Sequence, residues 1–136
     1  MSATWIAITQ FIVAGGLILF WIYFFTSENH NPKNTPEYLA FERAFPIPDL
    51  FWLTPALIIA GISVIQKSKW GVILTIGTGG SLIFLSLLDI SFNLQHKGYT
   101  KSRMDALINL TINSICIIIG IVYLFIGGTW IFSYSF

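Results

Sequence analysis

Four apolar stretches decide what this chain can fold into. They cover roughly residues 5–25, 48–65, 70–94 and 104–132, and the second is the shortest. A helix of about 20 residues spans the ~30 Å hydrocarbon core of a bilayer, so each stretch reaches or approaches transmembrane length. Hydrophobic residues occur all round these stretches, whereas a soluble bundle keeps a polar outer face. The pattern predicts an all-α integral membrane protein, a four-helix antiparallel bundle forming a single transmembrane domain over residues 1–136.

The composition agrees with this class and excludes others. Of 136 residues, 55% are hydrophobic and 10% are charged, which is too little polar surface to cover a soluble domain. The formal net charge of +1 gives no electrostatic basis for a nucleic-acid partner. The first stretch has no basic flank and no small-residue cleavage pattern, so we expect it to be retained rather than removed as a signal peptide. The expected partners are the lipid bilayer and, as alternatives, a second copy of the chain or a larger membrane complex.

Tryptophans and basic residues indicate the topology. Tryptophan rings favour the headgroup layer, and all of them lie near stretch ends: Trp5, Trp21, Trp52, Trp70 and Trp130. Antiparallel crossings place the first–second and third–fourth loops on one side, called the loop side here, opposite the turn at residues 66–69. The loop side has more basic residues, Lys33, Arg43, Lys97, Lys101 and Arg103, than the turn side, Lys67 and Lys69. The positive-inside rule then favours cytoplasmic loops, although a structured, partly acidic first loop also suits the outer side.

The first loop is predicted to contain a short interfacial helix over residues 36–45. Thr35 is a suitable N-cap, Pro36 lacks the amide hydrogen that a first turn leaves unused, and Glu37 lies near the positive end of the helix dipole. The helix should end by Phe45, because a proline disfavours helical angles at the preceding residue. At about 100° per residue, one face carries Tyr38, Phe41, Glu42 and Phe45. We expect this face, with Glu42 in it, to point toward the bundle.

The third and fourth stretches each gather their polar residues on one face. Within about 60° on a helical wheel, the third stretch places Thr75, Thr78, Gly79, Ser86, Asp89, Asn93 and His96. The fourth stretch repeats polar or small residues in steps of three and four, at Asp105, Asn109, Asn113, Cys116, Gly120, Tyr123 and Gly127. This spacing is typical of a packed helix seam, and its small residues permit close backbone approach.

The acids and amides of the loop side suggest a shared polar cavity. Its predicted members are Glu42, Asp49, Asp89, Asn93, His96, Asn109 and Asn113, with Trp52, Tyr99 and Asp105 as additional candidates. A charge within a span costs about 2.5–3.5 kcal/mol and usually marks function. Structural alternatives are a helix cap for Asp49, a hydrogen bond to Asn109 or Asn113 for Asp89, and interhelical bridging by those amides. Asp105 as a solvated first-turn acid and His96 as an interfacial loop residue are further alternatives.

Three ordered motifs, YLAFERAFPIPDLFWL, LLDISFNLQHKGY and INLTINS, carry a resemblance. The chain from about Phe24 to Ser114 resembles a group of small, largely uncharacterised prokaryotic four-span membrane proteins with AFPxxDxW and DxxxxLxHGxY patterns. The matching positions are Glu42, Phe45, Pro46, Asp49, Trp52, Asp89, Leu94, His96, Tyr99 and Asn109. Lys97 departs from the pattern, which has glycine directly after the histidine, and this leaves the geometry of the 96–99 turn open. The resemblance implies a prokaryotic plasma membrane and no particular activity.

Three functions fit this arrangement. The first is a ligand-binding protein or an accessory subunit, in which Glu42, Asp49 and Asp89 accept hydrogen bonds from a polar or cationic group. The second is an enzyme acting on a lipophilic substrate, with a buried carboxylate exchanging protons with His96 or Glu42. The third is a proton- or cation-coupled transporter with Asp89 as the titrating site. The first is the preferred interpretation, because the acids converge without a recognisable nucleophile or ligand set.

The positions of the histidines and the single cysteine restrict which cofactors the chain could bind. A divalent metal held by Glu42, Asp49, Asp89 and His96 is an alternative, since carboxylates and imidazole suit several metals. Bis-histidine haem is disfavoured, because His30 and His96 both lie in loops. The single cysteine, Cys116, forms no intrachain disulfide, and thiol chemistry that needs a CxxC pair is excluded.

Overall fold

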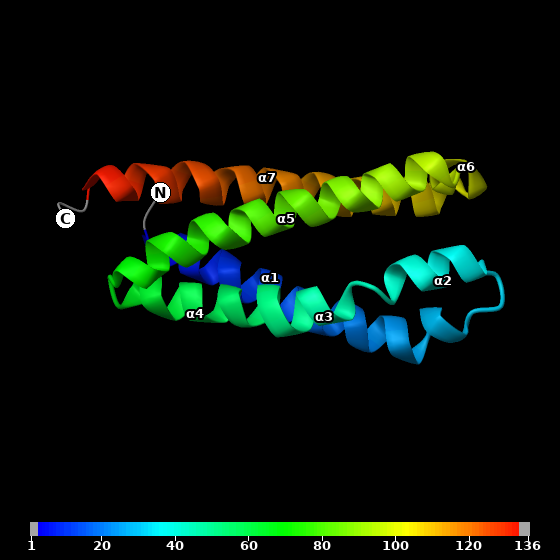
Figure 1. Ribbon diagram of the computed structural model, residues 1–136, viewed down its shortest axis with the longest axis horizontal. Helices are drawn as coiled ribbons and strands as arrows, with labels where there is room; N and C mark the ends of the chain where they lie inside the picture. Colours follow the sequence, from blue (N-terminus) through cyan, green and yellow to red (C-terminus); the bar gives the residue numbers. More distant parts are fainter. Residues whose placement is uncertain (1–2, 134–136) are drawn as a thin grey trace. The chain divides into compact units, whose positions relative to one another are not determined.

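The computed structural model describes residues 3–133, which fold into helices joined by short turns, and no strand occurs in that range (Figure 1). Four helical segments are long and apolar enough to cross a membrane, namely Ala3–His30, Pro36–Ile65, Lys69–Gln95 and Arg103–Ile131. The predicted all-α fold of four long, packed helices is therefore confirmed. The chain is a small polytopic integral membrane protein whose spanning helices contact the lipid bilayer.

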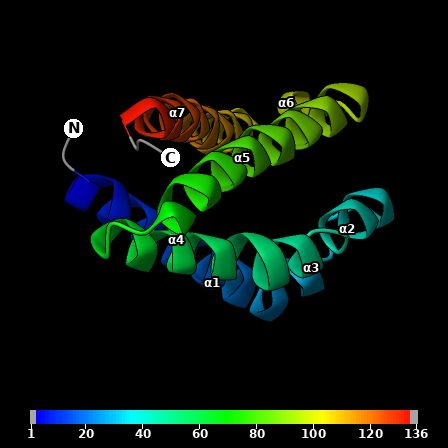
Figure 2. The same ribbon diagram turned by 60° about the vertical axis from the view of Figure 1, so that its left-hand side comes forward.

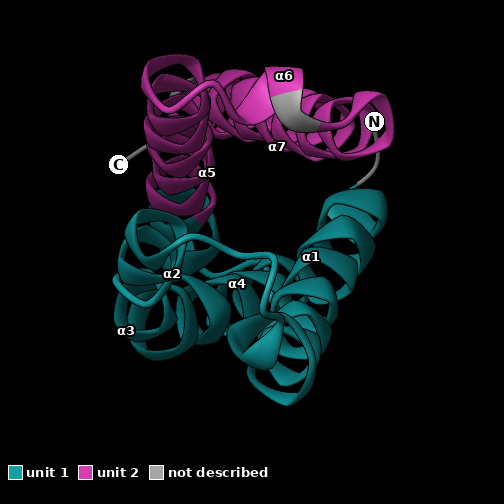
Figure 3. Ribbon diagram, turned by 90° about the vertical axis from the view of Figure 1, so that its right-hand side faces the viewer, with its two compact units in different colours: residues 1–74 teal, residues 75–136 magenta. Residues whose placement is uncertain are grey.

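The chain divides into two compact units, Met1–Leu74 and Thr75–Phe136 (Figure 3). The single transmembrane domain expected from the sequence stays a prediction. In the first unit, α1 (Ala3–Thr26) runs antiparallel to α4 (Thr54–Ile65), as Figures 1 and 2 show. A Cβ added at Gly61 of α4 would lie 2.8 Å from the Phe11 ring of α1. Glycine at this position therefore lets the two helices meet closely.

The second apolar stretch is not one regular helix. It begins with a single turn, α3 (Pro46–Pro48), continues as the π-helical segment η2 (Asp49–Leu53) and becomes regular only in α4. Pro55 explains the break, because it has no N–H to donate and its ring displaces the carbonyl one turn earlier. The Thr54 N–H accordingly bonds to the Asp49 carbonyl, five residues back. The π-helical segment was not predicted from the sequence.

The loop after α1 holds the predicted interfacial helix in a shorter form, α2 (Pro36–Glu42). Thr35 caps it as expected, with its hydroxyl accepting a 3.2 Å hydrogen bond from the Tyr38 N–H. The half-buried positions include the predicted face, Tyr38, Phe41, Glu42 and Phe45, while Glu37, Ala40 and Arg43 are exposed. The helix ends three residues early at Glu42. Phe45 nevertheless has helical angles, so the expected effect of Pro46 on its predecessor was wrong, because Phe45 caps the next turn.

The second unit packs α5 (Lys69–Gln95), from Thr75 onward, along α7 (Arg103–Ser133), and the short α6 (Gly98–Lys101) lies between these two helices in the sequence (Figure 2). A Cβ added at Gly79 would lie 2.8 Å from the Gly120 carbonyl oxygen, and one at Gly120 would lie 2.7 Å from the Gly79 carbonyl oxygen. A Cβ at Gly127 would lie 2.5 Å from Ile76 Cγ1. The predicted small-residue seam on α7 is thus used for close helix packing at positions 120 and 127.

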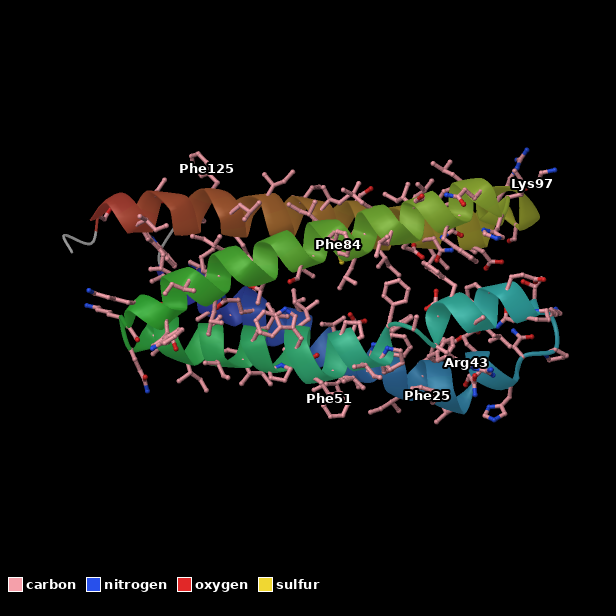
Figure 4. The ribbon with its side chains drawn as sticks, viewed as in Figure 1. Phe25, Arg43, Phe51, Phe84, Lys97 and Phe125 are labelled. Carbon is pink, nitrogen blue, oxygen red and sulfur yellow. The ribbon has the colours of Figure 1, made fainter. Side chains whose placement is uncertain are left out.

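The helices bury polar residues and expose apolar ones, which is the arrangement expected in lipid. On α5, the residues Thr75, Thr78, Ser86 and Asn93 are buried, whereas Phe84 is exposed. Phe51 and Phe125 project away from the helices that carry them (Figure 4). Water would penalise such surfaces, whereas hydrocarbon accepts apolar side chains and requires polar groups to pair internally.

Candidate functional site

The first unit contains a buried carboxylate at the start of its second spanning segment. Asp49 is 6% exposed, and its Oδ2 accepts a 3.0 Å hydrogen bond from Trp21 Nε1. The two residues meet because the end of α1 lies beside the start of the following span in the antiparallel pair. None of the short elements around Asp49 has a side-chain cap hydrogen bond. Phe45, Pro48 and Leu53 take the N-cap positions of these elements, and the Asp49 carboxylate bonds to an indole of the neighbouring helix.

One oxygen of this carboxylate has no hydrogen-bond partner. Asp49 Oδ1 is buried and unpaired, and so is the hydroxyl of Thr54, one π-helical turn further along the chain. A threonine inside a helix normally bonds back to the carbonyl four residues earlier. Here that regular pattern is interrupted by η2, and the Thr54 hydroxyl is left without a partner. We call Trp21, Asp49 and Thr54 the Asp49 site.

The second unit contains a different carboxylate arrangement. Asn93 Nδ2 donates to Asp89 Oδ1 at 3.2 Å and to the Asp89 carbonyl at 2.9 Å, within α5. The Asn113 amide of α7 donates to the other carboxylate oxygen, Oδ2. Both oxygens of Asp89 are therefore paired with neutral amides, and the residue bridges two helices. We call Asp89, Asn93, Tyr99 and Asn113 the Asp89 cluster.

The turn after α5 is held tightly against this cluster. Lys97 adopts the left-handed conformation, with φ 56° and ψ 30°, two residues after the end of α5. Left-handed angles after a helix end are usually taken by glycine, so a lysine at this position carries a conformational cost. Gly98 lies directly against this cluster, because a Cβ there would overlap Asn93 Oδ1. The backbone angles of Lys97 and the close contact at Gly98 thus define the 96–99 turn of this chain.

Tyr99 brings a hydroxyl to the Asp89 cluster. The hydroxyl oxygen is buried and makes no hydrogen bond of regular geometry. Burial, and next the negative charge of Asp89, raise the pKa of Tyr99 above its ordinary value of 10.0, while the Asn113 amide acts in the opposite direction. Tyr99 therefore stays protonated at neutral pH and presents a hydrogen-bond donor beside the carboxylate.

The other predicted site residues lie as follows. Glu42 is half-buried at the end of α2, and Trp52 is exposed on η2. His96 is exposed and stacks on Phe92, with ring centroids 4.2 Å apart. Asn109 is half-buried on α7, and Asp105 is exposed in the first turn of that helix. The exposed position of Asp105 agrees with the alternative of a solvated first-turn acid.

The predicted cavity residues are divided between the two units. Glu42, Asp49 and Trp52 belong to the first unit, and the remaining candidates belong to the second. The common cavity therefore stays a prediction. The same division applies to the four suggested metal ligands, Glu42, Asp49, Asp89 and His96. Within residues 3–133, no group of three His, Cys, Asp or Glu side chains is arranged to hold a metal ion.

Two site residues were missed by sequence reasoning, Trp21 and Thr54. Trp21 had been assigned to the headgroup layer, but it is 2% exposed and pairs with Asp49. A buried indole N–H requires an acceptor, and this was the available signal. Thr54 directly precedes Pro55, a position where the helix has to lose regular hydrogen bonds.

Comparison of the chain with protein-family models, with curated proteins and with solved structures gives no match.

Proposed function

We propose that this small polytopic membrane protein is a binding subunit, which holds a ligand or a partner protein through its intramembrane carboxylates. Asp49 is the residue that makes the decisive contact.

The spare oxygen of Asp49 is the observation that supports the proposal. Asp89 already has a neutral amide on each oxygen, so it can serve as a structural bridge without any further partner. Asp49 has a donor on Oδ2 only, while its buried Oδ1 lacks one. An unpaired polar atom in an apolar environment costs about 1–3 kcal/mol, and more if it is charged. A donor on a bound molecule would remove that cost, so binding is favoured where the protein leaves the acceptor open.

Native mass spectrometry of the protein purified in native nanodiscs tests this role. Asp49→Asn is the informative change, because the amide oxygen still accepts from Trp21 while the negative charge is lost. We expect the wild-type chain to carry a stoichiometric adduct, either a small molecule or a protein, and the Asp49→Asn variant to lose it. Glu37→Gln is the matched control, since Glu37 is an exposed acid in the first turn of α2.

The control should keep the adduct of the wild-type chain. Thermal unfolding of each variant establishes that it is folded before its adduct is compared. An adduct that survives Asp49→Asn unchanged in a folded protein would contradict the proposal, and so would a wild-type chain with no adduct.

A further inference from the structure

The geometry points to a primary ammonium group as the ligand of the Asp49 site. In this inference, Asp49 Oδ1 and the Thr54 hydroxyl oxygen accept N–H bonds from the ammonium at the π-helical break of the second span. The inference rests on the proposed function and specifies the chemistry that the same site recognises.

Charge is the first reason. The donor that the protein itself supplies to Asp49 is the neutral indole of Trp21. A carboxylate in a membrane span is stable when a cation or several hydrogen-bond donors approach it. A ligand that brings both, a positive charge and N–H groups, satisfies Oδ1 better than a neutral donor.

The number of acceptors is the second reason. Asp49 Oδ1 and Thr54 Oγ1 are both buried and unpaired. The break adds a third acceptor, because the Thr54 N–H is used by the Asp49 carbonyl and Pro55 has no N–H. In a regular helix the Leu50 carbonyl would accept from the Thr54 N–H, and in a π-helix it would accept from residue 55. Neither donor is available to it here. Interrupted helices occur in membranes where their freed carbonyls are used, commonly for cations.

The hydrogen bond already made to Asp49 and the ligands available in the chain disfavour other cations. A guanidinium normally grips both oxygens of a carboxylate, but Asp49 Oδ2 is already bonded to Trp21 at 3.0 Å. A divalent ion such as calcium takes six to eight oxygen ligands, and no group of three metal-binding side chains exists within residues 3–133. A quaternary ammonium has no N–H to donate. A primary ammonium has three N–H donors, enough for Asp49 Oδ1, Thr54 Oγ1 and one further acceptor.

Such an ammonium group has two sources, a lipid headgroup or a soluble amine. Asp49 begins its span directly after Pro46–Pro48, and Phe51 and Trp52 beside it are exposed, which suits the headgroup depth of a bilayer. Both sources present the same chemistry to Asp49. The experiment therefore needs one arm for each.

The lipid arm measures selectivity between headgroups. Delipidated protein is mixed with equal amounts of phosphatidylethanolamine, which has a primary ammonium, and phosphatidylcholine, which does not, and retained lipid is counted by native mass spectrometry. The soluble arm titrates ethylamine, with tetramethylammonium as the control cation, by calorimetry in phosphatidylcholine nanodiscs. We expect preference for the primary ammonium in at least one arm. An arm that shows it identifies the source.

Two variants locate the preference. Asp49→Asn should weaken binding by about 10- to 100-fold, as expected for a lost charged hydrogen bond. Thr54→Val keeps the carboxylate and removes only the hydroxyl, so it should weaken binding less, and Glu37→Gln should not change it. Equal binding of primary and quaternary ammonium in both arms would overturn the inference. If the adduct of the preceding experiment still depends on Asp49 in that case, the binding role stands and only the ammonium assignment falls.

Discussion

Trp21 and Asp49, 28 positions apart in the sequence, are joined by a 3.0 Å hydrogen bond from the indole nitrogen to a carboxylate oxygen. Both side chains are buried, so this bond fixes one end of α1 against the start of the second span. It also reserves Oδ2 and leaves Oδ1 as the open acceptor of the site. A single contact thus contributes to packing and determines which carboxylate oxygen is left without a hydrogen bond.

Removing the Trp21 donor should destabilise the fold. Trp21→Phe leaves both oxygens of Asp49 unpaired, and we expect a loss of about 1–3 kcal/mol in the free energy of unfolding. Thermal unfolding in detergent, followed by circular dichroism, measures it. Trp5→Phe is the same change at a residue that is 61% exposed, and it should have little effect. In an Asp49→Asn background, Trp21→Phe should cost less, because no carboxylate is left unpaired. Equal costs in both backgrounds would assign the loss to packing alone.

The glycine contact between α5 and α7 should tolerate no side chain. Gly120→Ala places a Cβ 2.6 Å from Ile83 Cγ1 and 2.7 Å from the Gly79 carbonyl, so the helices have to separate. We expect a marked fall in melting temperature, corresponding to about 1–3 kcal/mol for overpacking. Gly128→Ala lies on the same helix with nothing within 4 Å of the added atom. That control should be neutral or stabilising, since alanine is the better helix former by about 1 kcal/mol. Similar melting temperatures for the two variants would contradict the seam.

Replacing Lys97 by glycine should stabilise the fold. The left-handed backbone of Lys97, with φ 56°, costs a non-glycine residue about 1 kcal/mol or more. We expect Lys97→Gly to raise the free energy of unfolding by about 0.5–1 kcal/mol, measured by the same thermal unfolding (Figure 4 shows Lys97 at its turn). Lys97→Ala removes the charge but keeps the strained angles, so it should give no gain. If alanine and glycine stabilise equally, the lysine charge and not the backbone is responsible.

Tyr99 should titrate later than an ordinary tyrosine. Burial and then the Asp89 charge raise its pKa above 10.0, so the folded chain holds the phenol proton to a higher pH than the unfolded chain. The stability linked to Tyr99 is therefore complete below pH 10.0 and is lost as the pH rises through the folded-state pKa. The difference in absorbance near the phenolate band between wild type and Tyr99→Phe isolates this residue. Asp89→Asn should lower the midpoint, and an unchanged midpoint would rule out the charge contribution.

Local patterns in the sequence predicted much of the fold. The lengths of the apolar stretches predicted the four spanning segments. The Thr35–Pro36 pair predicted the start of α2 and the hydrogen bond that caps it. The steps of three and four on the fourth stretch gave the seam at Gly120 and Gly127. These features follow from residue type and spacing within one segment, because helix geometry alone decides which residues share a face.

The tertiary structure decided which polar groups meet. The sequence left Asn109 and Asn113 as equal candidates to bond Asp89, and in the folded chain the hydrogen bond is made by Asn113. It gave no sign that Trp21 would pair with Asp49 or that Pro55 would produce a π-helical turn beneath the carboxylate. Such partners depend on the rotation and register of one helix against another. Rotation and register are set by how whole helix faces fit together. The spacing of residues within one helix therefore does not predict them.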